Sequence, residues 1–146
     1  MDRGPAIALT LLAAGLVAFQ PPANAALSRH VGDLGATFVS LSISLLIIGV
    51  LLVAAGDPGD LRGISGFRPE HALGGIAGAA IVFVSLVTVR TLGVAGVAAL
   101  LVAGQLAVSV VIDRLGLLDV QTVGLTTARL AGVLLLVGGT ILVTSR

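Results

Sequence analysis

The positions of the ionisable side chains constrain this chain more than any other feature of its sequence. They leave five long uncharged runs, which are Gly4–Ser28, Leu34–Gly56, Ala72–Val89, Thr91–Ile112 and Leu130–Ser145. An α-helix needs about 20 apolar residues, within a range of roughly 17–25, to cross the hydrocarbon core of a bilayer. Four runs meet this length, and the fifth gains a turn if its helix begins near Thr126 and Arg129 extends towards the interface. The pattern predicts an all-α membrane protein with five transmembrane helices, at residues 4–28, 34–56, 72–89, 91–112 and 126–145.

The composition agrees with a chain whose solvent is lipid. Hydrophobic residues make up 57% of the sequence and charged residues only 10%, whereas a soluble domain carries roughly a quarter of its residues as charged ones. The length of 146 residues predicts a single transmembrane domain over residues 1–146. The absence of Lys, together with abundant Ala, Gly, Val and Leu, suggests a bacterial protein from a GC-rich genome.

The first run allows a second interpretation. Its charged start, its apolar stretch and the triplet Ala23-Asn24-Ala25 resemble a secretory signal peptide with its cleavage site. We favour a retained membrane helix that is bent at Pro21 and Pro22, because the start of the chain is barely basic. Whether this run is retained or cleaved stays open at the level of the sequence.

Polar side chains follow helical spacing inside several of the expected spans. Gln105, Ser109 and Asp113 are four residues apart, as are Gln20 and Asn24, and this spacing places each set on one helix face. Because a side-chain amide in hydrocarbon is costly without a partner, these faces are expected to point into the bundle. The alternative is that the amides only join helices and that the hydroxyls bond their own helix. The residues predicted to line a substrate pathway are Gln20, Asn24, Ser44, Gln105 and Ser109.

Ionisable residues do not occur near the middle of any expected span. Proton relays in transporters use Asp, Glu or His side chains inside the membrane. The residues available here for energy coupling, or for interfacial roles, lie at helix ends, and they are Asp33, Arg90 and Asp113. We also expect Asp113 to act as an interfacial cap or as the partner of Arg114.

Small residues recur at spacings typical of helices that pack together in lipid. Such helices associate through the close approach of small side chains, and Gly74 and Gly78 form one small-xxx-small pair. The glycines predicted to pack against neighbouring helices are Gly74, Gly75, Gly78, Gly104 and Gly132.

Motifs for catalysis or cofactor binding are not found in the sequence. The chain has no Cys, which excludes disulfides, thiol catalysis and thiolate metal sites. His30 and His71 fall in interfacial segments without a nucleophile motif, and the glycines lack the lysine or acidic partner of phosphate and dinucleotide loops. The arginines are spread along the chain and form no basic patch for nucleic acid. We therefore expect no enzyme activity, no cofactor, no metal and no nucleic-acid partner.

Several short motifs, taken in order, cover essentially the whole chain. They are Gln20 with Asn24–Leu27, Gly74–Gly78, Arg90–Gly93, Val102–Leu106 with Ser109 and Asp113, and Arg129–Gly132. This order resembles the YdcZ-type branch of the drug/metabolite transporter superfamily. The chain departs from that branch where Pro69, Glu70 and His71 replace the aromatic residues that often precede the third helix. The resemblance implies an inner-membrane exporter or permease with no assigned substrate.

The resemblance also implies an assembly. Ten-helix members of the superfamily look like two five-helix halves related as an inverted repeat, and this chain would supply one half. An odd number of spans places the termini on opposite faces, so two copies inserted in opposite directions would form the same architecture. We expect an antiparallel homodimer in membrane lipid, or a pair with an oppositely oriented paralogue. The arginines show only a weak positive-inside bias. With five spans, the membrane side that holds the N-terminus carries Arg3, Arg62, Arg68, Arg114 and Arg129, and the opposite side carries Arg29, Arg90 and Arg146.

Taken together, these features predict a transporter of small organic metabolites or drugs that works by alternating access. The rival interpretation is a non-transporting membrane subunit or scaffold that packs against a partner membrane protein. Polar faces on several apolar helices favour the first interpretation, because a substrate pathway requires them.

Overall fold

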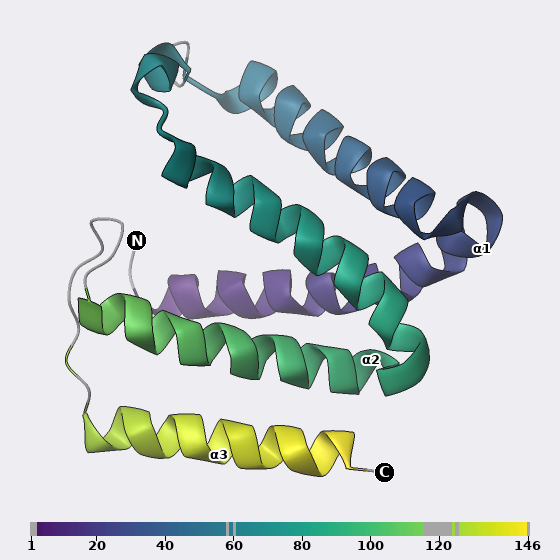
Figure 1. The fold of residues 1–146 in the computed structure, drawn as a ribbon. Helices are drawn as coiled ribbons and strands as arrows, with labels where there is room; N and C mark the ends of the chain where they lie inside the picture. Colours follow the sequence, from purple (N-terminus) through teal and green to yellow (C-terminus); the bar gives the residue numbers. More distant parts are fainter. Residues whose placement is uncertain (1–2, 58, 60, 116–123, 125, 146) are drawn as a thin grey trace. The chain divides into compact units, whose positions relative to one another are not determined.

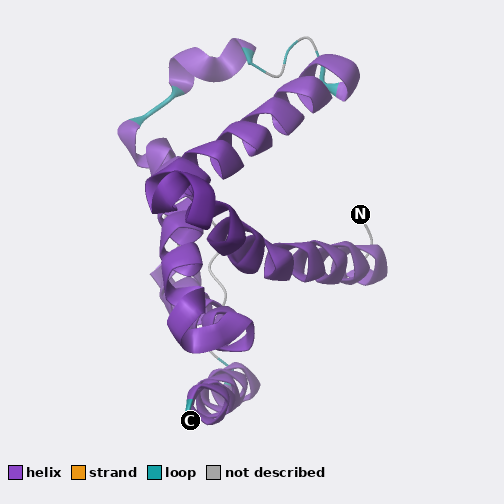
Figure 2. Ribbon diagram, turned by 90° about the vertical axis from the view of Figure 1, so that its right-hand side faces the viewer, coloured by secondary structure: helices purple, strands orange, loops and turns teal. Residues whose placement is uncertain are grey.

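The computed structural model describes residues 3–57, 59, 61–115, 124 and 126–145. The helices, in chain order, are α1 (Arg3–Ala55), the short 3-10 helices η1 (Arg62–Gly66) and η2 (Pro69–Ala72), α2 (Leu73–Leu115) and α3 (Thr127–Thr144). Within these described ranges no strand occurs, as Figure 2 shows. The prediction of an all-helical chain is confirmed for this part of the molecule.

Among the described residues, three helices are long and apolar enough to cross a membrane by length and composition. The difference from the five expected helices arises because α1 and α2 each join two of the expected runs. At a rise of 1.5 Å per residue, a straight helix of 53 residues, the length of α1, would reach about 80 Å. This is more than twice the roughly 30 Å of the hydrocarbon core. The number of helices therefore does not by itself give the number of crossings.

Both long helices contain one glycine whose backbone is not helical. Gly32 in α1 has φ 76° and ψ 168°, and Gly93 in α2 has φ 70° and ψ 168°. This combination is open almost only to glycine, because a Cβ atom would clash with the backbone. Figure 1 shows the consequence in α1, whose purple first part and blue second part run in clearly different directions. The sequence favoured a bend at Pro21 and Pro22, but the non-helical residue of α1 is Gly32.

The described residues form two compact units, residues 1–90 and 91–146. In the first unit, buried residues follow the helix period on both long helices. Pro21, Asn24, Ala25 and Ser28 form one stripe on α1, and Val82, Ser85, Leu86 and Val89 form another on α2. Ala36 and Leu86 are completely buried. We infer that these stripes form the small core of the first unit, next to the bend at Gly32.

In the second unit, α3 packs against the part of α2 that follows Gly93. The hydroxyl of Thr140 donates to the carbonyl oxygens of Leu136 and Ala99, at 2.8 and 3.3 Å. A Cβ atom added at Gly96 would lie 3.8 Å from Cγ2 of Thr144. Gly96 therefore allows the two helices to approach closely, as small residues do in membrane proteins.

The remaining surface of the long helices is apolar and exposed. Leu16 is 75% exposed, Leu46 68% and Val53 89%. Apolar areas of this extent are rare on soluble monomers and mark a membrane or a partner as the surrounding medium. The burial pattern thus agrees with a membrane protein, as the composition predicted.

Candidate functional site

A polar cluster lies at the bend of α1. We call it the Arg90 cluster, and it consists of Asn24, Ser28, Asp33 and Arg90. The Nη2 atom of Arg90 donates to Oδ1 of Asp33 at 2.6 Å and also to the hydroxyl oxygen of Ser28. The three residues come from both sides of the bend and from α2. The cluster therefore ties three helical segments of the first unit together.

The local backbone explains why these side chains meet. Gly32 ends the first helical segment of α1, so Asp33 is the first residue of the second segment. A carboxylate is favoured at this position by the positive end of the helix dipole. Arg90 lies three residues before Gly93, where its charge faces the negative end of the preceding helical segment. The helix dipoles thus favour Asp33 and Arg90 at these positions, and the ion pair between them adds to this stabilisation.

The Asp33–Arg90 pair is only partly shielded. The side chain of Arg90 is 47% exposed and that of Asp33 is 35% exposed. Ser28 and Asn24, by contrast, are only 6% and 7% exposed. The cluster therefore runs from an open charged end at Asp33 and Arg90 to a closed neutral end at Ser28 and Asn24, which come earlier in α1.

The closed end holds an amide without a partner. The Nδ2 atom of Asn24 is buried and has no hydrogen-bond partner among the described residues. Such groups are rare in native proteins, because an unpaired buried donor costs roughly 1–3 kcal/mol. Gln20, one turn earlier on α1, is half-buried. Of the two amides that the sequence singled out in this helix, Asn24 thus belongs to the Arg90 cluster and Gln20 lies one turn before it.

The second unit contains its own ion pair. Nη2 of Arg129 donates to Oδ2 of Asp113 at 2.6 Å, and the two side chains are 38% and 22% exposed. The partner of Asp113 is thus Arg129, and the expected pairing with Arg114 is wrong. Thr126 caps α3, since its hydroxyl oxygen accepts a hydrogen bond from the backbone N–H of Arg129 at 3.2 Å.

The other predicted pathway residues are exposed in the single chain. Gln105 and Ser109 are exposed on the second unit, and Ser44 is exposed on α1. The hydroxyl of Ser44 donates to the carbonyl oxygen of Ser40 at 3.1 Å, so its own helix satisfies it. Gln105 is an exposed amide within an apolar helix, and such a group needs a partner outside its own helix if lipid surrounds it.

The predicted packing glycines do not contact a neighbouring helix within the described part of one chain. A Cβ atom added at any of them would find no atom within 4 Å outside its own helix backbone and chain neighbours. Their surfaces therefore stay free in the single chain, and their role in helix packing stays a prediction. These residues are Gly74, Gly75, Gly78, Gly104 and Gly132.

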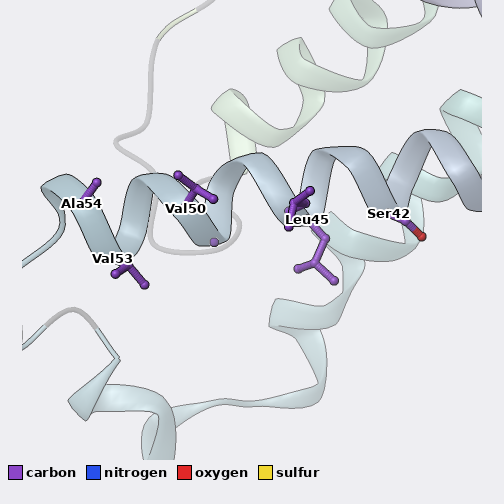
Figure 3. A pocket seen from close by; sticks show the side chains of 7 residues that line it. Ser42, Leu45, Val50, Val53 and Ala54 are labelled. Atoms are coloured by element: carbon purple, nitrogen blue, oxygen red, sulfur yellow. The ribbon is translucent and has the colours of Figure 1, made fainter.

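A shallow depression of about 670 Å³ lies elsewhere, on the second part of α1. Figure 3 shows that its lining side chains come from this one helix, and Ser42 is the only polar one among them. None of the predicted pathway residues lines it. An open, apolar surface on a single helix fits lipid chains better than a polar substrate, so we assign it no role in recognition.

Sequence reasoning missed Ser28 and Ser85. Ser28 continues the stripe of Gln20 and Asn24 at the next interval of four, so the spacing alone was enough to find it. Ser85 is 3% exposed, and its hydroxyl donates to the carbonyl oxygen of Val82 at 3.1 Å. Thr88 follows Ser85 at an interval of three, but this pair gave no signal because neither residue carries a side-chain amide or a charge.

A family model described as "Putative inner membrane exporter, YdcZ" matches residues 5–142 of the chain. The match covers both units, the Arg90 cluster and every residue predicted to line a pathway. It confirms the resemblance that the sequence motifs indicated. No curated protein and no solved structure matches the chain.

Proposed function

The chain belongs to the YdcZ branch of the drug/metabolite transporter superfamily, and from this membership we propose that it exports small organic metabolites or drugs. The observation that carries the proposal is the match to an inner-membrane exporter family over residues 5–142. The unpartnered amide of Asn24 supports it. A transport pathway must present polar groups whose partners arrive with the substrate, and a buried donor next to an ion pair has this character.

We propose that the chain crosses the membrane five times. The two non-helical glycines support this, because each divides a helix that is too long for one crossing into two segments of suitable length. Gly32 lies between the first two uncharged runs, and Gly93 lies near the junction of the third and fourth. The charged residues Asp33 and Arg90 then fall at one membrane surface, where water reduces the cost of their charges.

The proposed pathway begins at the Arg90 cluster, which includes Asn24, and continues to Gln20. Gln105 and Ser109 contribute a second polar face, which is exposed in the single chain. In hydrocarbon this face needs cover, and a second subunit would supply it. We therefore propose a dimer, either antiparallel or with a paired paralogue, in which alternating access exposes the polar faces to each side in turn.

Export is tested first through ligand binding and then through flux. A panel of metabolites and cationic dyes is screened for compounds that raise the unfolding midpoint of the purified protein, as a ligand of the folded state must. The compound with the largest shift is then used in flux measurements with everted membrane vesicles. We expect Asn24→Ala and Gln105→Ala to lower the flux severalfold while the helix content of the protein is preserved.

Thr10→Ala is the matched control for Asn24→Ala. Thr10 is an exposed polar residue of the same helix, and its hydroxyl bonds the carbonyl oxygen of Ala6 at 2.8 Å. Its loss should leave the flux unchanged. If Asn24→Ala and Gln105→Ala destabilise the protein but transport at the normal rate, these amides only join helices. If no compound is transported at all, the non-transporting subunit becomes the better interpretation.

Single cysteines test the five crossings and the orientation together. The chain has no Cys of its own, so Gly4→Cys, Val31→Cys and Ser145→Cys each give one reactive thiol. We expect an impermeant maleimide to label all three in intact cells if the protein inserts both ways. Leu46→Cys, in the middle of a proposed crossing, should stay unlabelled because lipid covers it.

Labelling of Val31→Cys and Ser145→Cys alone would exclude dual insertion and favour a paired paralogue. A thiol at position 31 that stays unreactive even in permeabilised cells would contradict the five crossings, because Gly32 would then lie within the hydrocarbon. The experiment thus separates the number of crossings from the orientation.

A further inference from the structure

The segment between α1 and α2 repeats a three-residue pattern that the proposed export function does not use. Residues 61–69 read Leu-Arg-Gly, Ile-Ser-Gly and Phe-Arg-Pro. An apolar residue, a polar residue and a glycine or proline thus recur in the same order three times. Side chains at i and i+3 eclipse in a 3-10 helix, and η1 lies at the centre of this segment. The pattern therefore sorts side chains onto separate edges.

Backbone hydrogen bonds connect the apolar members of the pattern directly. The N–H of Ile64 donates to the carbonyl oxygen of Leu61 at 3.1 Å, and the N–H of Phe67 donates to that of Ile64 at 3.0 Å. We call these three residues the apolar edge. Arg62 and Ser65 occupy the next position within η1 and are exposed; we call them the polar edge. Arg68 follows in extended backbone and is also exposed.

The apolar edge is open to its surroundings. Leu61 is 60% exposed, Ile64 66% and Phe67 55%. The three residues line one depression of about 370 Å³ together with His71 and two glycines. A Cβ atom at Gly63 or Gly66 would meet no atom within 4 Å, so the absence of side chains there leaves room beside the edge.

The charged side chains of this segment do not form a strong binding surface of their own. Nη1 of Arg68 lies 3.7 Å from Oε1 of Glu70, and the two side chains are 73% and 43% exposed. Solvent therefore makes the attraction between these charges weak. Oδ1 of Asp57 accepts a hydrogen bond from the backbone N–H of Gly59 at 2.8 Å. The segment is therefore not a basic patch. Its distinguishing property is a row of three apolar side chains with Arg62 and Arg68 beside it.

The segment is held close to the membrane at both ends. α1 ends at Ala55, and η2 leads directly into α2 at Leu73. Both helices are apolar enough to cross a bilayer. Apolar side chains in such a position enter the boundary between headgroups and acyl chains, while flanking arginines stay at the level of the phosphates.

We propose that residues 61–68 lie in the membrane interface and bind phospholipid, with the apolar edge against acyl chains and Arg62 at the phosphates. The partner is a glycerophospholipid of the surrounding bilayer, and the interaction does not depend on the transported substrate. It would hold the connection between α1 and α2 against the membrane surface while the rest of the chain moves.

Tryptophan fluorescence tests this directly, because the chain contains no Trp and no Tyr. Leu61→Trp, Ile64→Trp and Phe67→Trp each place one fluorophore on the apolar edge. The full chain is reconstituted in nanodiscs of phosphatidylcholine brominated near the headgroup end of its acyl chains. We expect blue-shifted emission, quenching by the brominated lipid, and a loss of quenching by aqueous iodide.

Ser65→Trp is the matched control on the polar edge. It also corrects for the tendency of any Trp to enter the interface. We expect it to emit at longer wavelength and to be quenched by iodide. The proposal is overturned if Leu61→Trp and Ile64→Trp are as accessible to iodide as Ser65→Trp. Equal quenching of all four variants by brominated lipid would equally overturn it, since no edge would then be distinguished. Circular dichroism and elution volume establish that each variant is folded.

Discussion

Replacement of Gly32 by Ala is expected to destabilise the first unit by about 1–3 kcal/mol, the cost of holding a non-glycine residue in this region of φ/ψ space. The space around the glycine is not the cause, because a Cβ atom there would meet no other atom within 4 Å. The cause is the backbone, whose φ of 76° and ψ of 168° an L-residue rarely adopts. A chain that avoids this strain must straighten α1, and it then separates Asp33 from Arg90.

The unfolding midpoint of the purified protein in detergent measures this effect. Gly15→Ala is the matched control, because Gly15 lies in the same helix and also has open space around it. Its backbone is helical, so Ala should be neutral there or stabilising by up to about 1 kcal/mol. Gly93→Ala should lower the midpoint as Gly32→Ala does. Equal midpoints for Gly32→Ala and Gly15→Ala would show that the bend is not held by glycine.

Replacement of Arg90 by Ala is expected to lower the free energy of unfolding by about 1.5–3 kcal/mol, the usual range for hydrogen bonds to charged groups. The variant loses the bonds to Asp33 and Ser28 and leaves the carboxylate without its partner. The partial exposure of both charged side chains places the effect towards the lower end, because solvent screens the pair.

A double-mutant cycle isolates the pair from the rest of the side chain. Arg90→Ala, Asp33→Ala and the double variant should give a coupling energy of about 1 kcal/mol, as residues in one ion-pair network do. Arg29→Ala serves as the control, since Arg29 is exposed and lies close to the same bend. A coupling energy near zero would mean that Arg90 stabilises the unit through packing of its side chain alone. Loss of flux in Arg90→Ala with normal folding would extend its role from structure to transport.

Several properties of this chain follow from local physical chemistry and were accessible from the sequence. Long runs without charge predict helices in lipid, because backbone groups in hydrocarbon must bond within their own segment. The interval between Gln20 and Asn24 predicted a shared helix face, and in the structure Asn24 is buried and Gln20 is half-buried on that face. The motif order also indicated the YdcZ family, which the match over residues 5–142 confirms. Five crossings, the substrate and the dimer remain proposals.

The tertiary structure alone decided which charged residues meet and where α1 breaks. Asp33 and Arg90 are 57 positions apart. Asp113 forms its ion pair with Arg129 and not with its sequence neighbour Arg114. Such partners depend on which helices come together, and no local rule specifies this. The break at Gly32 similarly depends on a glycine-only conformation, whereas the sequence drew attention to Pro21 and Pro22, which stay within the helix. The uncharged runs thus predicted that the chain lies in lipid and forms helices. The residues of the Arg90 cluster, in contrast, come together only through contacts between helices.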